Sequence, residues 1–221
     1  MTRSKSAKYP PQFIVTMLQF IAYAISKTVW FIRYEGGKNI PPVTSGGFLI
    51  AANHQTYLDP VWICLPMRRR IRYLAIEKAF GWRFIGPLIR FLGAFPVKQT
   101  DGLSVSSIKE ALHSLREGAV LTIFPEGGRE FEDGVMFPFK QGAVRLAIQA
   151  GVPILPVTVR GGNLIWPQGR HYPRVFRRVE IIYHPLLNVQ AEPGLTQDEY
   201  LDKWTGRLRE IIASGAEIGS N

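Results

Sequence analysis

The sequence almost lacks cysteine, because Cys64 is the only one among its 221 residues. A single cysteine cannot form an internal disulfide, and it excludes zinc sites that need several thiolates. The neighbours of Cys64 are Trp62, Ile63 and Leu65, none of which is charged. We therefore expect a small buried side chain rather than a reactive thiol, and a reducing compartment.

Acidic residues are also scarce relative to basic ones. Lys and Arg number 27 and Asp and Glu 17, which gives a formal net charge of +10 and an isoelectric point near 9.9. An excess of this size indicates an anionic partner, and nucleic acid and anionic lipid are the two common classes. No recognisable nucleic-acid-binding motif is present. We therefore predict an anionic membrane surface as the partner, and no nucleic acid.

Long apolar runs are missing as well, with one borderline exception over residues 13–27. Polar side chains recur in this run every three or four positions, which places them on one narrow stripe of a helix opposite a wide apolar face. Basic residues precede the run, at Arg3, Lys5 and Lys8. The segment combines the features of several kinds of helix.

Four interpretations of this segment remain open at the level of sequence. A signal peptide would have a cleaner apolar region, a spanning helix needs about 20 mainly apolar residues, and a helix packed on its own domain would also have two faces. We favour an amphipathic helix in the lipid headgroup region, because this explains both the stripe and the basic flank. We therefore divide the chain into an anchoring segment, residues 1–27, and one folded domain, residues 28–221.

The folded domain alternates between short apolar runs and amphipathic segments. The apolar runs predict strands at 28–34, 48–52, 93–98, 119–124, 153–159 and 179–183. The amphipathic segments predict helices at 104–117 and 141–150, a short helix near residue 59, and a last helix from a capping box at 196–199 to about residue 213. Such alternation is typical of an α/β domain with a mostly parallel sheet flanked by helices.

The first candidate for chemistry is the pair His54 and Asp59. His54 follows an apolar run, and Asp59 comes five residues later at the predicted helix start. An Asp in this place can hold the imidazole in one tautomer and stabilise the imidazolium that forms when His54 takes a proton. A chance spacing of His and Asp on a loop is the alternative.

The second candidate is the segment 124–130, with the sequence Phe-Pro-Glu-Gly-Gly-Arg-Glu directly after an apolar run. Ligands of open α/β sheets bind at the carboxyl ends of strands, and Arg has the best shape for a phosphate. A tight turn with a solvated Arg is the alternative. Two further segments accompany it: 93–98 ends in a cation, and 152–157 contains two prolines, of which Pro156 predicts a sheet edge or a bulge.

In order and identity, these four segments resemble the motifs of the glycerolipid acyltransferase family, especially the bacterial lysophosphatidic acid acyltransferases. The family pattern is H-x-x-x-x-D, a G-x-x-P-V-x-R-like segment, F-P-E-G-x-R and V-P-x-x-P, and the likeness covers about residues 36–159. The resemblance implies an acyltransferase domain that moves a fatty acyl group from an acyl thioester to the free hydroxyl of a lysophospholipid. The simplest such reaction converts lysophosphatidic acid to phosphatidic acid.

The resemblance also implies roles for single residues and partners. His54 would be the general base, with Asp59 as its orienting partner. The pocket for the glycerol-phosphate acceptor would be formed by residues of the second and third motifs and the segment after them, namely Lys98, Glu126, Gly127, Arg129 and Lys140. The acyl donor would be acyl-CoA or an acyl carrier protein thioester, with no metal and no cofactor. The enzyme would be membrane-associated on the cytoplasmic face.

One departure from the family pattern concerns the acceptor headgroup. The second motif of the family usually ends in Asp-Arg, whereas Lys98-Gln99 stands here, and Lys lacks the bidentate geometry of Arg. Acylation of another lysolipid such as lyso-ornithine lipid, a thioesterase, and a non-catalytic lipid-binding relative therefore remain alternatives. The arginines of 68–72 and 170–178 face either anionic partners or solvent.

Overall fold

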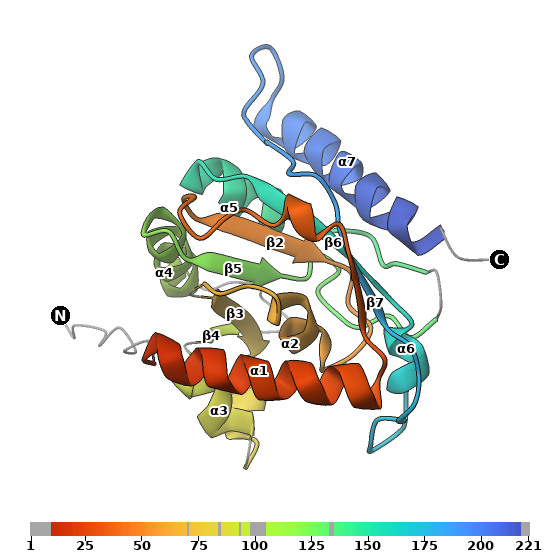
Figure 1. Cartoon of the computed structure of the whole chain (residues 1–221). Coiled ribbons are helices and arrows are strands. Elements are labelled where there is room, and N and C mark those ends of the chain that lie inside the picture. Colours follow the sequence, from red (N-terminus) through yellow and green to blue (C-terminus); the bar gives the residue numbers. More distant parts are fainter. Residues whose placement is uncertain are drawn as a thin grey trace.

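The computed structural model describes residues 10–69, 71–83, 85–92, 94–97, 105–132 and 135–217, which form one α/β unit (Figure 1). Its helices are α1 (Gln12–Val29), α2 (Asp59–Cys64), α3 (Ile85–Phe91), α4 (Val105–Arg116), α5 (Gly142–Ala150), α6 (Gly162–Ile165) and α7 (Gln197–Glu217). Its strands are β1 (Arg33–Glu35), β2 (Phe48–Ala52), β3 (Ile71–Ile76), β4 (Phe95–Val97), β5 (Val120–Ile123), β6 (Ile154–Arg160) and β7 (Glu180–Tyr183). Two short 3-10 turns are η1 (Gly37–Asn39) and η2 (Glu77–Gly81).

The strands form one sheet in the order β1-β7-β6-β2-β5-β3-β4. Each neighbouring pair is parallel except β6 and β7, which are antiparallel. The predicted α/β fold with a mostly parallel sheet flanked by helices is therefore confirmed. Because β2, β5 and β6 run in the same direction at the centre, their carboxyl ends meet at one edge of the sheet, where open sheets bind ligands.

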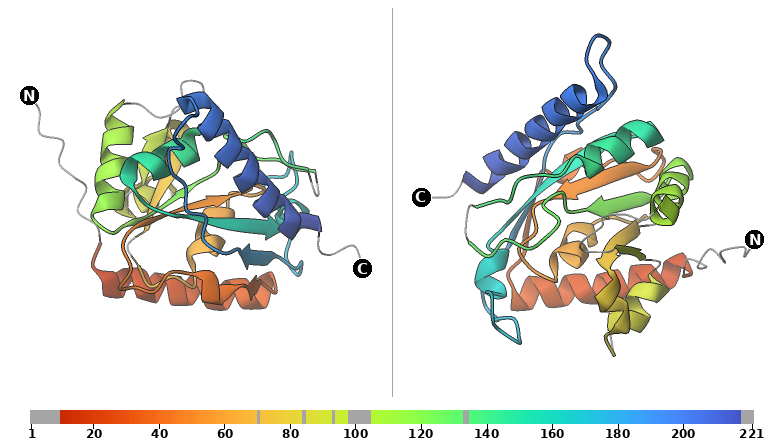
Figure 2. Two further views of the ribbon diagram at one scale, coloured as in Figure 1. Left: turned by 90° about the horizontal axis from the view of Figure 1, so that it is seen from above. Right: turned by 180° about the vertical axis from the view of Figure 1, so that it is seen from behind.

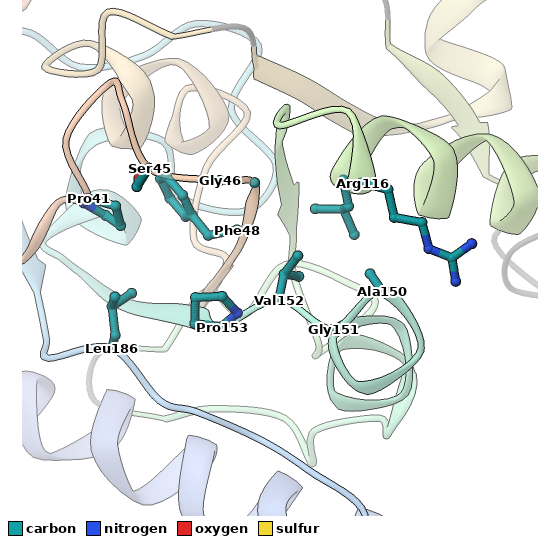
Figure 3. Close-up of a pocket in the computed structure, with 12 residues that line it drawn as sticks. Pro41, Ser45, Gly46, Phe48, Arg116, Ala150, Gly151, Val152, Pro153 and Leu186 are labelled. Carbon is teal, nitrogen blue, oxygen red and sulfur yellow. The ribbon is translucent and has the colours of Figure 1, made fainter.

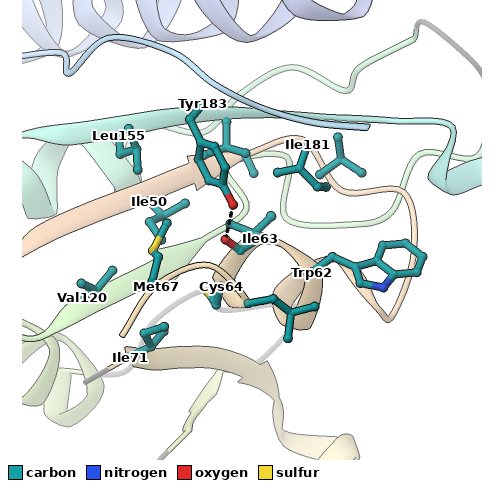
Figure 4. Packing of buried hydrophobic residues seen from close by; sticks show 14 of the residues in the cluster. Ile50, Trp62, Ile63, Cys64, Met67, Ile71, Val120, Leu155, Ile181 and Tyr183 are labelled. Carbon is teal, nitrogen blue, oxygen red and sulfur yellow. Dashed lines mark hydrogen bonds between the residues drawn. The ribbon is translucent and has the colours of Figure 1, made fainter. Parts of the chain in front are cut away.

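Helices cover both faces of this sheet, and β2 supplies side chains to both. Leu49 and Ala51 pack into the core with residues of α4, α5 and α7, whereas Ile50 packs into the core with residues of α2. Such alternation along a fully buried strand requires apolar residues at every position. On the second face, the Tyr183 hydroxyl donates a 2.8 Å hydrogen bond to the Ile63 carbonyl (Figure 4).

The predicted strand at 28–34 is wrong in its first half, because α1 continues to Val29 and β1 begins at Arg33. β-branched and aromatic residues favour strands only weakly, and tertiary contacts override that preference. The Trp30 indole donates to the Arg174 carbonyl at 2.8 Å, and its ring packs edge-on against Trp62. These contacts fix the chain where the helix ends.

The edge position predicted for Pro156 is also wrong, because β6 lies between β2 and β7. The alternative that it marks a bulge is confirmed by the register. Val157 pairs with Tyr183 but Ile154 pairs with Leu187, so two residues of β6 stand opposite the three residues 184–186 that follow β7. This irregular pairing accommodates a residue that has no N–H to donate.

The arginines at 68–72 do not form a common exposed surface. Arg69 and Arg72 are buried, whereas Arg68 is exposed. Strand β3 begins within this segment, and no strand was predicted there because arginine interrupts its apolar pattern. By contrast, the capping box before α7 is confirmed, with Thr196 and Glu199 bonded reciprocally, and α7 continues to Glu217.

Helix α1 lies on the opposite side of the sheet from α7 (Figure 2). The middle of its polar stripe faces the domain, where the Gln19 amide donates to the Met67 carbonyl at 2.9 Å and to the Cys64 carbonyl at 3.3 Å. Its large apolar side chains are exposed, namely Phe13, Met17, Leu18, Phe20, Ile21 and Ile25. By length and composition the helix is long and apolar enough to cross a membrane, and only 11% of it is buried.

Candidate active site

The carboxyl end of β2 carries His54, and the first residue of α2 is Asp59. The loop between them folds back so that His54 Nδ1 lies 2.9 Å from Asp59 Oδ2. Asp59 is fully buried, whereas the His54 side chain is 18% exposed. The two residues that the sequence pairs are therefore in contact, with the imidazole facing solvent and the carboxylate behind it.

Three further hydrogen bonds hold the Asp59 carboxylate. Its Oδ2 accepts from the backbone N–H groups of Gln55 at 2.6 Å and Thr56 at 2.7 Å, and its Oδ1 accepts from the Thr56 hydroxyl at 2.7 Å. Such bonds offset the cost of burying a charge. An ionised carboxylate only accepts, so the proton of neutral His54 lies on Nδ1 and the lone pair on Nε2.

The ring of His54 is fixed from a second side by Phe124. The two rings stack with their centroids 4.0 Å apart and their planes 20° apart. Phe124 follows β5, which is hydrogen-bonded to β2. A residue of the F-P-E-G-x-R motif therefore fixes the histidine of the H-x-x-x-x-D motif. In the part of the chain that the structure describes, no hydrogen-bond partner of His54 Nε2 is found. This atom is therefore available to a substrate.

Glu126 supports the same loop through the backbone. Its Oε1 accepts from the His54 N–H at 2.7 Å and its Oε2 from the Phe137 N–H at 2.8 Å. The backbone N–H of Glu130 donates to the His54 carbonyl at 2.8 Å. Burial raises the pKa of Glu126 to about 7. The geometry favours a bracing role for Glu126, and its predicted contact with the acceptor stays a prediction.

Gly127 and Lys140 lie against each other. Gly127 has φ +71, and a Cβ at this position would stand 2.8 Å from the Lys140 ammonium nitrogen. The Lys140 N–H donates to the Pro125 carbonyl at 2.9 Å, which fixes the approach. Only glycine combines this backbone conformation with room for the ammonium group.

Arg129 stacks on an aromatic side chain that the sequence did not single out. Its guanidinium carbon lies 3.5 Å from the centre of the Tyr57 ring and 4.7 Å from that of Phe131. Trp82 and Trp166 both contact the Tyr57 ring in edge-on arrangements. Burial lowers the pKa of Arg129. Stacking of this kind holds the planar guanidinium in one orientation. The sequence signal that could have identified Tyr57 is that it is an aromatic residue inside the H-x-x-x-x-D motif.

The predicted contribution of Lys98 lies outside the described residues, as does Gln99. Among the described residues, no group of three or more His, Cys, Asp and Glu side chains is placed to hold a metal ion. The absence of a metal or cofactor stays a prediction.

A shallow pocket of about 400 Å³ lies at the other edge of the sheet (Figure 3). It is lined by residues that precede β2, β5 and β6, including Gly46, Arg116 and Pro153. His54 lies at the carboxyl end of β2, so this pocket is separated from the His54 site by the length of the strands. It takes no part in the arrangement described above.

Comparisons with known proteins agree with this geometry. A family model described as Acyltransferase matches residues 31–160. The chain is 30% identical over 160 residues to a chloroplastic 1-acyl-sn-glycerol-3-phosphate acyltransferase of Brassica napus, covering 72% of this chain and 46% of that protein. It is 34% identical over 145 residues to the 1-acyl-sn-glycerol-3-phosphate acyltransferase of Bacillus subtilis, covering 63% and 69% respectively. The chain thus spans about half the length of the plant relative.

A solved structure extends the likeness beyond the motifs. The crystal structure of the 1-acyl-sn-glycerophosphate (LPA) acyltransferase PlsC from Thermotoga maritima matches with a TM-score of 0.70 at 26% identity. The match covers 93% of this chain and 78% of that chain. With the family match over more than half of its length, the chain belongs to the acyltransferase family.

Proposed function

We propose that this protein moves a fatty acyl group from an acyl thioester to the free hydroxyl of a lysophospholipid, and that it converts lysophosphatidic acid to phosphatidic acid. The observation that carries the proposal is the His54–Asp59 pair, with Nε2 of His54 available at the carboxyl end of β2. The relatives named above are called 1-acyl-sn-glycerol-3-phosphate acyltransferases, which supports this acceptor.

In the proposed reaction, His54 Nε2 removes the proton of the acceptor hydroxyl as its oxygen attacks the thioester carbonyl. A C–O bond forms, the carbonyl becomes a tetrahedral oxyanion, and Asp59 stabilises the imidazolium. Backbone N–H groups of the surrounding loops are the simplest donors to this oxyanion. The intermediate then collapses, the C–S bond breaks, and the leaving thiolate takes the proton from His54.

The acceptor phosphate is proposed to bind beside Gly127. Arg129, held by Tyr57, offers a bidentate contact, and the exposed Lys140 adds positive charge next to Gly127. Lys98 is proposed to add charge from the second motif. Glu126 would act on the reaction through the backbone of His54 rather than on the phosphate, because both of its oxygens accept backbone N–H groups and like charges repel.

The donor is proposed to be acyl-CoA or acyl carrier protein, with no metal and no cofactor. The exposed apolar face of α1 is proposed to lie in the headgroup region of an anionic membrane, on the cytoplasmic side. Its polar stripe contacts the domain through Gln19, which supports a helix lying along the surface. No nucleic acid partner is proposed.

The proposal is tested by acyl transfer from a labelled acyl thioester to lysophosphatidic acid in detergent. We expect His54→Ala to lower kcat by at least about 10³-fold, and Asp59→Asn by about 10²- to 10⁴-fold because the wrong tautomer is held. The matched control is His113→Ala, an exposed histidine on α4, which should leave the rate unchanged.

Other outcomes of this assay are informative. Equal phosphatidic acid formation by His54→Ala would contradict the mechanism. Product with another lysolipid, such as lyso-ornithine lipid, in place of lysophosphatidic acid would correct the acceptor and keep the reaction. Release of free fatty acid without lysolipid would indicate a thioesterase.

A further inference from the structure

Two exposed phenylalanines have a backbone conformation that bulky residues rarely adopt. Phe31 has φ +44 and Phe176 has φ +57, and no other residue except glycine has positive φ in the described part of the chain. Their rings contact each other with centroids 6.2 Å apart, yet their side chains are 50% and 68% exposed. Such strain persists only where the surrounding structure enforces it, and it is common at functional sites.

Hydrogen bonds to the end of α1 enforce this arrangement. The Phe176 N–H donates to the Val29 carbonyl at 2.8 Å, and the Trp30 indole donates to the Arg174 carbonyl at 2.8 Å. The segment after α6 therefore lies against the C-terminal end of α1, as both views show (Figures 1 and 2). Phe31 and Phe176 are 145 residues apart in sequence. Their contact therefore depends on the tertiary structure and not on one local turn.

These rings belong to a larger exposed apolar surface. Tyr172 is 80% exposed and Val175 is 49% exposed on the same segment. We call Phe31, Tyr172, Val175 and Phe176 the aromatic tip. It lies beside the C-terminal end of α1, where the Phe176 N–H bonds to the Val29 carbonyl, and the large apolar side chains of α1 are also exposed. Exposed large apolar side chains gathered on one part of the surface mark sites of interaction.

The charge around the aromatic tip selects its partner. Four exposed arginines lie on the same segment, namely Arg170, Arg174, Arg177 and Arg178. Aromatic side chains beside cations are typical of surfaces at a membrane interface, where the ring enters the headgroup level and the cation meets anionic lipid. This combination fits an anionic phospholipid bilayer.

Helix α6 and the segment after it, which bears the tip, contact the loop between His54 and Asp59. The Gly162 N–H donates to Gln55 Oε1 at 2.9 Å, and the Trp166 ring lies 5.3 Å from that of Tyr57. Gln55 and Tyr57 both lie between His54 and Asp59. Only a short segment of the chain therefore separates a lipid surface bound at the aromatic tip from the loop that carries the proposed base, His54.

We propose that the aromatic tip is a second membrane contact beside α1, and that it inserts into the interface of an anionic phospholipid bilayer. The inference deepens the proposed function and rests on it for the lipid nature of the acceptor. Its test measures binding alone, so that a failure here is distinct from a failure of acyl transfer.

The first test is sedimentation of the full chain with vesicles of phosphatidylglycerol and phosphatidylcholine. Phe176→Gly removes the ring and suits the backbone at φ +57, so its melting temperature should not fall. We expect its partitioning onto the vesicles to weaken about ten-fold. The control is Leu195→Gly, in the loop before α7 on the opposite side of the sheet from α1 (Figure 2), which should bind as the native chain does.

The second test places an environment-sensitive fluorophore on Phe176→Cys. The label is selective because the native Cys64 is buried. We expect a blue shift when anionic vesicles are added, because the fluorophore leaves water. Native vesicle binding by Phe176→Gly, or a label spectrum that does not move when the protein binds, would overturn the proposal.

Discussion

At the scale of single residues, Glu126 is a buried acid whose surroundings disfavour the charged form. Burial raises its pKa from an ordinary value of 4.5 to about 7, against the opposing effect of two backbone N–H groups. Between these two pH values the folded chain therefore holds more protons than the unfolded chain. Stability rises with pH only where the unfolded state binds more protons. Raising the pH through this window must lower the free energy of unfolding.

Glu126→Gln tests this sign, because the amide does not ionise. In the variant, one of the two side-chain oxygens that accept backbone N–H groups is replaced by an amide nitrogen. The variant should therefore be less stable than the native protein at every pH. The native protein should nevertheless lose on the order of 2 kcal/mol relative to the variant between about pH 4.5 and about pH 7, since solvent screening weakens the full shift. Urea unfolding of both proteins across this range measures the difference. Parallel pH profiles would contradict the assignment.

At the scale of elements, Arg69 connects the loops that precede two central strands. Its guanidinium donates to the carbonyls of Pro42 at 2.9 Å, Ser45 at 2.7 Å and Gly46 at 2.8 Å before β2, and of Gly118 at 3.2 Å before β5. The Ser45 hydroxyl accepts a further bond at 2.8 Å. Burial lowers the pKa of Arg69. Arg69 itself is buried, so these five bonds replace the water that its guanidinium loses on folding.

Arg69→Met should therefore lower the free energy of unfolding by about 3 kcal/mol, because five hydrogen bonds from a charged donor that joins two loops are lost. Arg69→Lys should restore only part of this loss, since an ammonium group lacks the guanidinium fork. Arg68→Met removes an exposed neighbour and should change stability by less than about 0.5 kcal/mol. Chemical denaturation compares the three. If Arg68→Met and Arg69→Met lowered the free energy of unfolding equally, the hydrogen bonds of Arg69 would not contribute to stability.

At the scale of the whole molecule, the net charge of +10 combines with the exposed apolar face of α1. Raising NaCl from about 0.05 M to about 0.5 M shortens the screening length roughly three-fold. We expect this change to weaken binding to phosphatidylglycerol vesicles at least ten-fold, because charge attraction is screened. Binding to neutral phosphatidylcholine vesicles should change little. Salt-independent binding to the anionic vesicles would show that the charge has no part in it.

The sequence alone predicted the class of fold, the order of most elements and the pairing of His54 with Asp59. These features depend on local information. The apolar runs and amphipathic segments show their periods within a few residues, and the capping box at Thr196 and Glu199 is complete within four. The spacing of His54 and Asp59 likewise lies inside one short loop.

Only the tertiary structure showed what surrounds these residues. Glu126 contacts the backbone of His54 from 72 residues away, Tyr57 lies against Arg129, and the polar stripe of α1 faces inward through Gln19. The predicted strand at 28–34 was wrong in its first half because Trp30 and Arg174, far apart in sequence, fix the end of the helix. Local periods record which residues are apolar, whereas the partner of a buried polar group depends on which strands become neighbours in the sheet.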